Sequence, residues 1–284
     1  MLLDKLLKII DENLPAESAM EGDRIGLQVQ SGRHKVESIL ITLEMNEDVL
    51  KEAIKLNCDC IITFHPLIYS PLTAIKDSDR VGNLCSGLIR NSITLIAVHT
   101  NYDAFAEGTS KILADRLGLR VIDFLKPDDN FEDKGMGVVA KPKQPLSEEE
   151  LLELVHNVCK SPIRYSTYKS NTKIDKIAIV GGSGTSFMNN ALTCGAQAFI
   201  TADITYHRFH EVNRDIMLID PGHYEMEQFV PEGIARLLSE KLNKSEYKSV
   251  MVSQALTNPV NYYPDTDKYI QLQKNYLLNN KMVV

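Results

Sequence analysis

The sequence predicts an α/β protein in which short buried strands alternate with helices. Two observations carry this prediction. Aliphatic and β-branched runs recur along the chain, with helix-like stretches between them. Three of these runs end in His, Asp or Glu, within the segments IITFHPLIYS (61–70), IAVHTNYDAF (96–105) and LIDPGHYEMEQ (218–228). Short apolar runs bounded by polar residues are typical of strands buried in a parallel sheet.

The first half of the chain supplies three strands and the helices between them. We expect strands at 36–44, 60–65 and 94–100, and helices at 46–57, 79–92 and 110–119. Asn46 is the expected N-cap of the first of these helices. Ahead of them, residues 1–14 have an apolar helical face interrupted by charges, which predicts an amphipathic helix rather than a signal peptide. Such alternation implies right-handed crossovers and a parallel sheet.

A second, similar series follows. Its expected strands are 135–142, 176–182, 198–203 and 216–220, and Ser147 with Glu150 predicts a capped helix from 148. The polar segment 126–135 is the candidate linker. We therefore expect two lobes, residues 1–128 and residues 129–284. The second ends in an Asn- and Tyr-rich tail (253–281), which we expect either to lie over the surface or to be partly mobile.

Composition narrows the class of protein. A net charge of −7 argues against a nucleic-acid-binding surface over the whole molecule. No apolar run approaches the ~18–20 residues that a membrane-spanning helix needs. Five cysteines, an odd number and widely spread, suit a reducing cytoplasm without a disulfide framework. We expect a cytoplasmic globular protein with no membrane partner.

Polar side chains that follow the predicted strands indicate a metal site. Ligands of open α/β sheets bind beyond the carboxyl ends of the strands. Five side chains are expected to face this one crevice: His65, His99, Asp103, His223 and Glu227. Imidazoles and carboxylates that converge without nearby cysteines indicate a divalent metal of the Zn, Mn, Fe or Ni kind.

Each of these residues also has an ordinary structural interpretation. His65 alone would be a histidine with its hydrogen bonds satisfied in a turn, and Asp103 would be a helix N-cap near the positive end of the dipole. His223 and Glu227 lie four residues apart, so one helical turn would place both on the same face, either as a chelating pair or as an exposed surface pair. Three such junctions together favour metal binding.

Two further motifs remain open between alternatives. GGSGTS (181–186) fits a backbone cradle for an oxyanion or phosphate, and it fits equally a tight turn capped by Ser183 or Thr185. It lacks the lysine of a P-loop. Asp203 and His207 form another pair four residues apart, either lining the site or lying on the surface.

The chain resembles the NGG-interacting-factor-three-like family, also called GTP cyclohydrolase I type II homologues. The resemblance runs in family order from residue 22 to about residue 240. The segments that carry it are GDRIGLQVQSG (22–32), TFHPLIYSPL (63–72), HTNYDAFAEG (99–108), VGGSG (180–184), TADITYH (201–207) and DPGHYEMEQ (220–228).

This resemblance implies a two-lobed α/β fold with largely parallel sheets, flanking helices and a dinuclear metal site between the lobes. It implies a ligand role for His65, Asp103, His223 and Glu227. The family usually has two consecutive histidines before the proline, and here the first is Phe64, whose phenyl ring cannot ligate. One of the two metal positions therefore loses a ligand. That position is expected to bind metal weakly, to be empty, or to be completed by water or His99. One or two ions are therefore expected per chain.

The resemblance also suggests a function. We expect a metal-dependent hydrolase that acts on a nucleotide or related heterocycle, with the opening of a purine ring, as in a GTP cyclohydrolase, as the named reaction. His99 is the expected general acid or base, or a neighbour that orients a ligand, because an imidazole pKa near 6.5 suits proton transfer. The alternative is a non-enzymatic metal-binding scaffold or regulator, which Phe64 favours. The family likeness further implies a ring-shaped homohexamer, with support from the tyrosines of the tail: Tyr262, Tyr263, Tyr269 and Tyr276.

Overall fold

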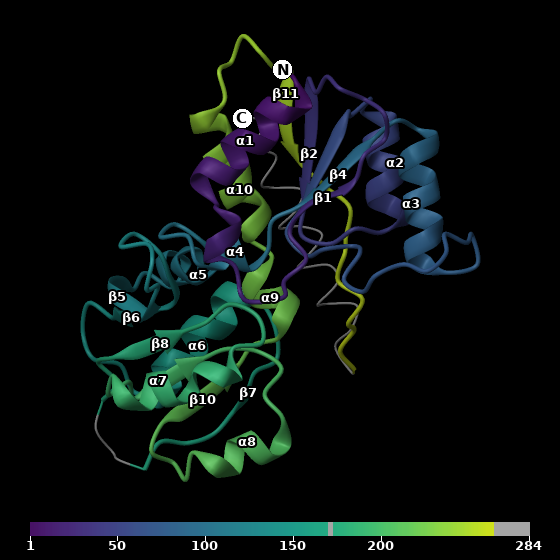
Figure 1. Ribbon diagram of the computed structural model, residues 1–284. Helices are drawn as coiled ribbons and strands as arrows, with labels where there is room; N and C mark the ends of the chain where they lie inside the picture. The colour runs from purple at the N-terminus through teal and green to yellow at the C-terminus, as the bar shows by residue number, and fades with distance from the viewer. Residues whose placement is uncertain (170–172, 264–284) are drawn as a thin grey trace. The chain divides into compact units, whose positions relative to one another are not determined.

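The computed structural model describes residues 1–169 and 173–263 and shows two compact units (Figure 1). Unit 1 comprises Met1–Tyr102 and Val230–Pro259. Unit 2 comprises Asp103–Phe229 and is joined by residues 260–263. Within the described ranges, no helix has both the length and the apolar character needed to cross a membrane.

The sheet of unit 1 has the strand order β1-β4-β3-β2-β11. Its strands are β1 (Gly26–Val29), β2 (Ser38–Thr42), β3 (Cys60–Thr63), β4 (Thr94–Ala97) and β11 (Ser249–Val252). Strands β4, β3, β2 and β11 run parallel, and β1 pairs antiparallel with β4 at one edge. Thr42 pairs with Thr63 and Thr63 with Ala97, so three strands end level with one another. The predicted parallel arrangement therefore holds in this unit.

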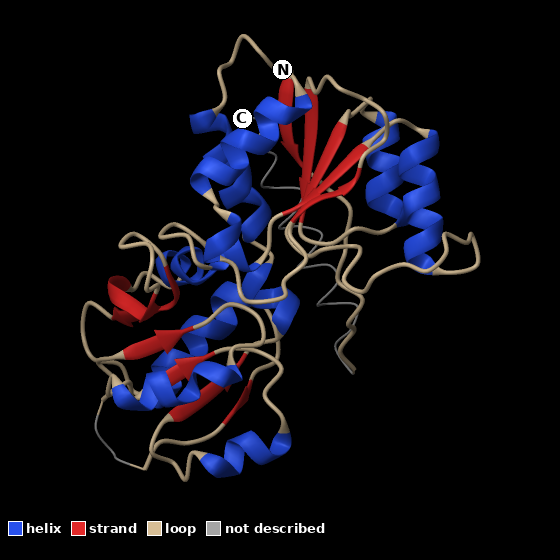
Figure 2. Ribbon diagram, in the orientation of Figure 1, coloured by secondary structure: helices blue, strands red, loops and turns tan. Residues whose placement is uncertain are grey.

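Helices flank both faces of this sheet (Figures 1 and 2). The helices of unit 1 are α1 (Leu3–Asn13), η1 (Ala16–Ser18), α2 (Glu47–Lys55), α3 (Arg80–Arg90) and α10 (Val230–Lys241). The short helix α4 (Thr100–Asp103) lies where the chain passes to unit 2. Asn46 accepts a bond from the N–H of Val49, as expected for the cap of α2. Helices α2 and α3 bury Val49, Ala53 and Leu84 against Leu40 and Ile61 of the sheet.

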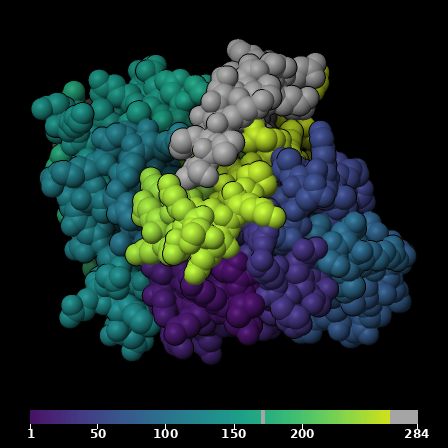
Figure 3. All heavy atoms as spheres, turned by 90° about the horizontal axis from the view of Figure 1, so that it is seen from above, coloured from purple at the N-terminus to yellow at the C-terminus, as the bar shows by residue number. Residues whose placement is uncertain are grey.

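The segment that follows α10 lies beside the N-terminal helix, where Figure 3 shows yellow-green and purple residues together. The amino group of Met1 donates to the backbone carbonyl of Glu246 at 2.7 Å, and Lys5 Nζ lies 2.6 Å from the Glu246 carboxylate. Exposed ion pairs of this kind stabilise little. The position of this segment therefore depends mainly on its backbone bonds and on the parallel pairing of β11 with β2.

The sheet of unit 2 has the order β5-β6-β8-β9-β10-β7 and is mixed. Its strands are β5 (Arg120–Pro127), β6 (Gly135–Lys141), β7 (Arg164–Tyr165), β8 (Ile177–Ile179), β9 (Ala198–Ile200) and β10 (Met217–Asp220). Only β8, β9 and β10 are parallel; β5, β6 and β7 pair antiparallel. The expectation of a largely parallel sheet does not describe this unit, because a β-hairpin and a two-residue edge strand flank the parallel centre.

The helices of unit 2 are α5 (Thr109–Arg116), α6 (Glu148–Cys159), η2 (Thr185–Phe187), α7 (Met188–Thr193), α8 (Tyr206–Glu211) and α9 (His223–Glu227). Ser147 and Glu150 form the predicted capping box at the start of α6. Met188 and Ala191 of α7 pack on Phe199 and Leu218 of the sheet. These contacts give unit 2 an apolar core of its own.

The division into units differs from the lobe boundary after residue 128 that the charged segment 126–135 suggested. Strand β5 pairs with β6 antiparallel, with Pro127 opposite Gly135. The charged segment is therefore mostly the loop of a hairpin inside unit 2. The first segment of unit 1 ends at Tyr102, and Val230–Pro259, further along the chain, also belongs to this unit.

Candidate metal centre

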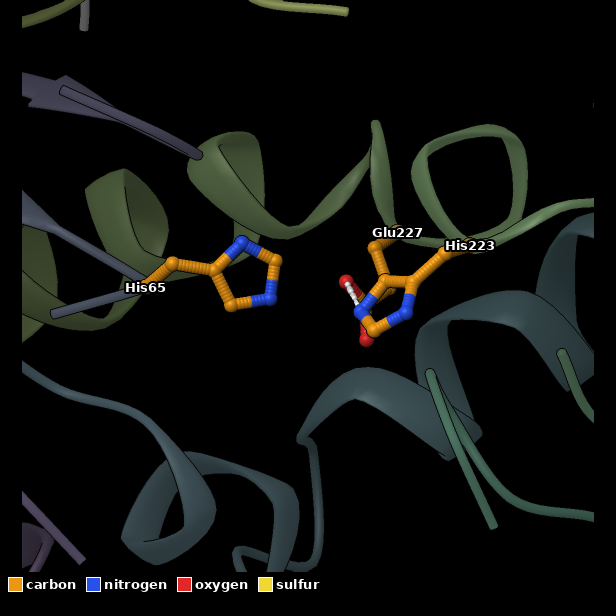
Figure 4. Close-up of side chains that lie close together, drawn as sticks. All are labelled: His65, His223 and Glu227. Carbon is orange, nitrogen blue, oxygen red and sulfur yellow. Dashed lines mark ion pairs between the residues drawn. The ribbon is translucent and has the colours of Figure 1, made fainter. Parts of the chain in front are cut away.

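In unit 2, His223 and Glu227 form the pair that their spacing predicted. Helix α9 begins at His223 and ends at Glu227, and His223 Nε2 lies 3.1 Å from Glu227 Oε2 (Figure 4). The Glu227 side chain is only 2% exposed. Two ligands at ~2.0–2.2 Å from one ion lie about 3 Å apart. The spacing of these two atoms therefore suits joint coordination of a single cation.

The other ring nitrogen of His223 is held by Asp203. Nδ1 lies 2.7 Å from Asp203 Oδ2. A carboxylate on one imidazole nitrogen fixes the ring orientation and makes the other nitrogen a better ligand. Asp203, predicted as a site-lining residue, thus lies where it can orient His223.

The protonation of His223 depends strongly on the two carboxylates beside it, Asp203 and Glu227. Burial would lower the pKa of His223, but hydrogen bonds to Asp203 and Glu227 outweigh it and raise this pKa to about 11. The hydrogen bond from His223 is the largest influence on Asp203 and lowers its pKa. Two carboxylates therefore hold a proton on the imidazole. A divalent cation would supply positive charge to the same carboxylates in place of that proton.

The turns after the parallel strands of unit 2 share one backbone feature. Ile179 pairs with Ile200, and Ile200 with Ile219. Three residues beyond each of these positions the backbone has a positive φ: 59° at Gly182, 55° at Asp203 and 96° at Gly222. The left-handed conformation is rare for a non-glycine residue and tends to occur at functional sites. It turns the chain sharply at each strand end and places Asp203 beside His223.

Asp220, the last residue of β10, supports two of these turns. Its carboxylate accepts the N–H of Ile204 and that of Gly222, each at 3.0 Å, and pairs with Arg164. The buried carboxylate thereby joins the turn after β9 to the start of α9.

Glycines of the segment 181–186 lie close to acidic side chains. A Cβ added at Gly181 would lie 3.8 Å from Asp103 Oδ1, which places this predicted ligand beside the turn.

The glycine turn itself is held by Thr201. Thr201 Oγ1 accepts the N–H of Gly184 and donates to the carbonyl of Gly182, each at 2.8 Å. No side-chain cap bond forms at the start of η2. The turn is thus held by Thr201 and not by a Ser183 or Thr185 cap, which was one of the two alternatives for this segment.

In unit 1, His65 and His99 lie at the same register position. Each stands two residues beyond the level strand ends Thr63 and Ala97, and their ring centroids are 5.4 Å apart. His65 Nδ1 lies 3.1 Å from Oε2 of Glu44, whose other oxygen lies 3.2 Å from Arg80. Glu44 itself follows Thr42 by two residues. The strand-end rule that indicated the histidines therefore also applies to Glu44, which sequence reasoning missed.

His99 is held by Asp23, a second residue that sequence reasoning missed. His99 Nδ1 lies 2.8 Å from Asp23 Oδ1, and the other carboxylate oxygen accepts the N–H of Thr100 at 3.0 Å and its hydroxyl at 2.5 Å. Asp23 follows no strand, so the strand-end rule could not have found it.

Phe64 is fully buried among aromatic rings of unit 1. Its ring centroid lies 4.9 Å from that of His65, 5.4 Å from His99 and 6.3 Å from Tyr102. It therefore packs directly against the two imidazoles, as expected for a site-lining residue, while offering no ligand atom. His207 lies elsewhere in unit 2, on the exposed helix α8, with its ring 5.5 Å from that of Tyr206.

The fold and these two groups define a class: α/β proteins of two units with imidazole–carboxylate pairs at the carboxyl ends of their strands. The chain matches the Duf34/NIF3 (NGG1p interacting factor 3) family over residues 1–259 and belongs to that family.

Several relatives span nearly the whole chain. A GTP cyclohydrolase 1 type 2 homolog of Streptococcus pneumoniae is 31% identical, over 92% of this chain and 100% of the relative. One of Lactococcus lactis is 35% identical, over 86% and 93%. Among solved structures, the Staphylococcus aureus hypothetical protein SA1388 has a TM-score of 0.84 at 28% identity and covers 92% of this chain and 99% of its own. Reduced HcgD from Methanocaldococcus jannaschii has a TM-score of 0.72 at 25% identity, over 89% and 97%.

Proposed function

We propose that this protein binds a divalent metal ion and acts as a metal-dependent hydrolase on a nucleotide or a related heterocycle. The observation that carries the proposal is the His223 arrangement. A buried carboxylate faces one nitrogen of the ring at 3.1 Å, and a second carboxylate orients the ring through the other nitrogen. Buried charged groups are costly unless they are paired or bind a metal, and this donor set suits a transition metal.

Asp103 and His65 complete the proposed ligand set. Asp103 lies beside the glycine turn of the His223 unit. His65 belongs to unit 1, and its carboxylate-held ring is built like that of His223. The family likeness implies a ligand at both positions.

When bound, such an ion supplies Lewis acidity that activates water near neutral pH. His99 is the proposed general acid or base. Asp23 holds its Nδ1, so Nε2 is the atom that takes or gives a proton. Asp23 is only 5% exposed, which keeps this ring in one orientation.

The substrate class rests on the relatives. Those of S. pneumoniae and L. lactis carry the name GTP cyclohydrolase 1 type 2 homolog, and a purine nucleotide is the substrate that this name suggests. A non-enzymatic metal-binding scaffold is the second candidate, because Phe64 fills a position beside His65 and His99 where the family usually has a ligand.

The test has two stages. Elemental analysis of protein purified by gel filtration measures the bound metal, and the metal-restored protein is then incubated with a nucleotide panel that includes GTP. A ring-opened or hydrolysed product that requires the metal supports the hydrolase. Bound metal without turnover of any nucleotide favours the scaffold, and protein that takes up no transition metal contradicts both.

The presence of Phe64 leads to a prediction about the number of metal ions bound per chain. We expect fewer than two tightly bound equivalents per chain, because a phenyl ring supplies no ligand. Phe64→His should raise occupancy of the second position, as measured by elemental analysis after dialysis against a weak chelator. Two chelator-resistant equivalents in the unmodified protein would contradict this expectation, unless His99 proves to be a ligand.

A further inference from the structure

Gly182 lies against the side chains of Glu227 and His223, the pair proposed to coordinate the metal. A Cβ built at this residue would lie 2.5 Å from Glu227 Oε1 and 3.0 Å from His223 Nε2. The first distance is shorter than real side chains show, so either the turn or the ligands would have to move.

The turn is not free to move away. The carbonyl of Gly182 accepts the N–H of Ala202 and the hydroxyl of Thr201, both at 2.8 Å. Thr201 is fully buried and bonds the same turn a second time through Gly184. A side chain at residue 182 would therefore displace Glu227 or His223.

The missing side chain leaves space at the place where coordination is proposed. Zinc–nitrogen and zinc–oxygen bonds are ~2.0–2.2 Å long. A methyl group 2.5 Å from one oxygen of the Glu227 carboxylate and 3.0 Å from His223 Nε2 would lie within or against the volume that a shared ion and its remaining ligands occupy.

We infer that Gly182 is a positioning residue, whose lack of a side chain keeps open the coordination space against Glu227 and His223. This inference rests on the proposed metal-binding function. It assigns the glycine of the turn a role in metal affinity, distinct from the backbone conformation that it also permits.

A matched control separates these two roles. Gly195 also has a positive φ, 73° against 59° at Gly182, but a Cβ there meets no atom within 4 Å. Alanine at either position strains the backbone in a similar way. Only Gly182→Ala places a methyl group against the ligands.

The experiment is a Co²⁺ titration followed by the ligand-field absorption of the bound ion, with thermal unfolding of the metal-free proteins in parallel. Gly182→Ala should lower Co²⁺ affinity about 10–100-fold, the size of effect seen when residues that support metal ligands are changed. Gly195→Ala should bind like the unmodified protein. Equal Co²⁺ affinity of the two variants would overturn the inference while leaving the proposed function standing.

A double-mutant cycle tests the contact itself. Glu227→Asp withdraws the carboxylate from residue 182, so Gly182→Ala should fold and cost less affinity in that background than in the unmodified protein. An equal cost in both backgrounds would overturn the inference. Failure of the unmodified protein to take up Co²⁺ would overturn the proposed function and this inference together.

Discussion

Three histidines share one arrangement, in which a carboxylate holds the Nδ1 atom of the ring. The Nδ1 atoms of His65, His99 and His223 face carboxylates of Glu44, Asp23 and Asp203 at 3.1, 2.8 and 2.7 Å. Such a partner fixes the ring orientation and leaves Nε2 as the nitrogen available for metal coordination or proton transfer. The sequence indicated all three histidines through the strand ends that precede them. It indicated only one of their partners, because a partner such as Asp23 is recruited from a distant loop by the tertiary fold.

Glu227→Gln should weaken metal binding about 10-fold or more, because it replaces a buried anionic ligand with a neutral amide. Glu225→Gln is the matched control on the same helix α9. Glu225 is equally buried but lies toward Gly222 and the Tyr262 hydroxyl. A metal titration of both variants checks this. Equal losses would mean that the helix does not present Glu227 as a ligand.

Asp23 is expected to make a pH-dependent contribution to the free energy of unfolding. Burial would raise its pKa, but hydrogen bonds from His99 and Thr100 outweigh it and hold the pKa well below its usual range. The carboxylate therefore stabilises the fold fully above the unfolded pKa of ~3.9, and this contribution is lost as pH falls below it. Asp23→Asn should cost about 1–3 kcal/mol at pH 7 and less at pH 3, as measured by urea unfolding. A cost that does not change with pH would contradict this assignment.

At the scale of elements, the predicted strands and helices formed wherever burial and periodicity agreed. Strand β3 (Cys60–Thr63) and helix α6 (Glu148–Cys159) lie within two residues of their expected positions. Edge strands were missed: β1, β5, β7 and β11 were not expected. An edge strand is exposed on one side and lacks the continuous apolar run of a central strand, and β5 (Arg120–Pro127) is largely exposed. Its pairing partner, not its own composition, makes it a strand.

Helix α6 gives a prediction at this scale. Ser147→Ala should destabilise the protein by about 1 kcal/mol, because it removes the side-chain bond to the N–H of Glu150. Ser183→Ala is the control, since Ser183 is exposed and η2 has no side-chain cap bond. Denaturant unfolding of both variants measures the difference. A loss of equal size at Ser183 would show that serine removal itself, not the cap, is responsible.

At the scale of the whole molecule, the family likeness leads us to propose a homohexamer, built as a trimer of dimers with closed symmetry. Among the tail tyrosines, Tyr262 contacts Glu225 of its own chain and Tyr263 is 95% exposed, whereas Tyr269 and Tyr276 lie outside the described residues. Of the two described tail tyrosines, Tyr263 is the one with most of its aromatic surface exposed to a partner.

Light scattering coupled to size exclusion measures the assembly directly. We expect a mass near six chains at micromolar concentration. Tyr263→Ser should reduce the assembly if this ring contacts a partner, and Tyr206→Ser, at another exposed tyrosine, should not. A mass of one chain would refute the hexamer, and a dimer would leave only half of the proposal standing.

The path of the chain between the units has a consequence for synthesis. Unit 2 is nearly continuous, whereas unit 1 begins with Met1–Tyr102 and is completed by Val230–Pro259. Strand β11, which pairs with β2, and helix α10, which buries Ile234 and Leu238, are therefore made only after Asp103–Phe229 of unit 2. Because domains form as their residues leave the ribosome, the inserted unit can fold while the surrounding one still waits for its edge strand. The nascent N-terminal strands must then remain without that partner until more than a hundred further residues have been translated.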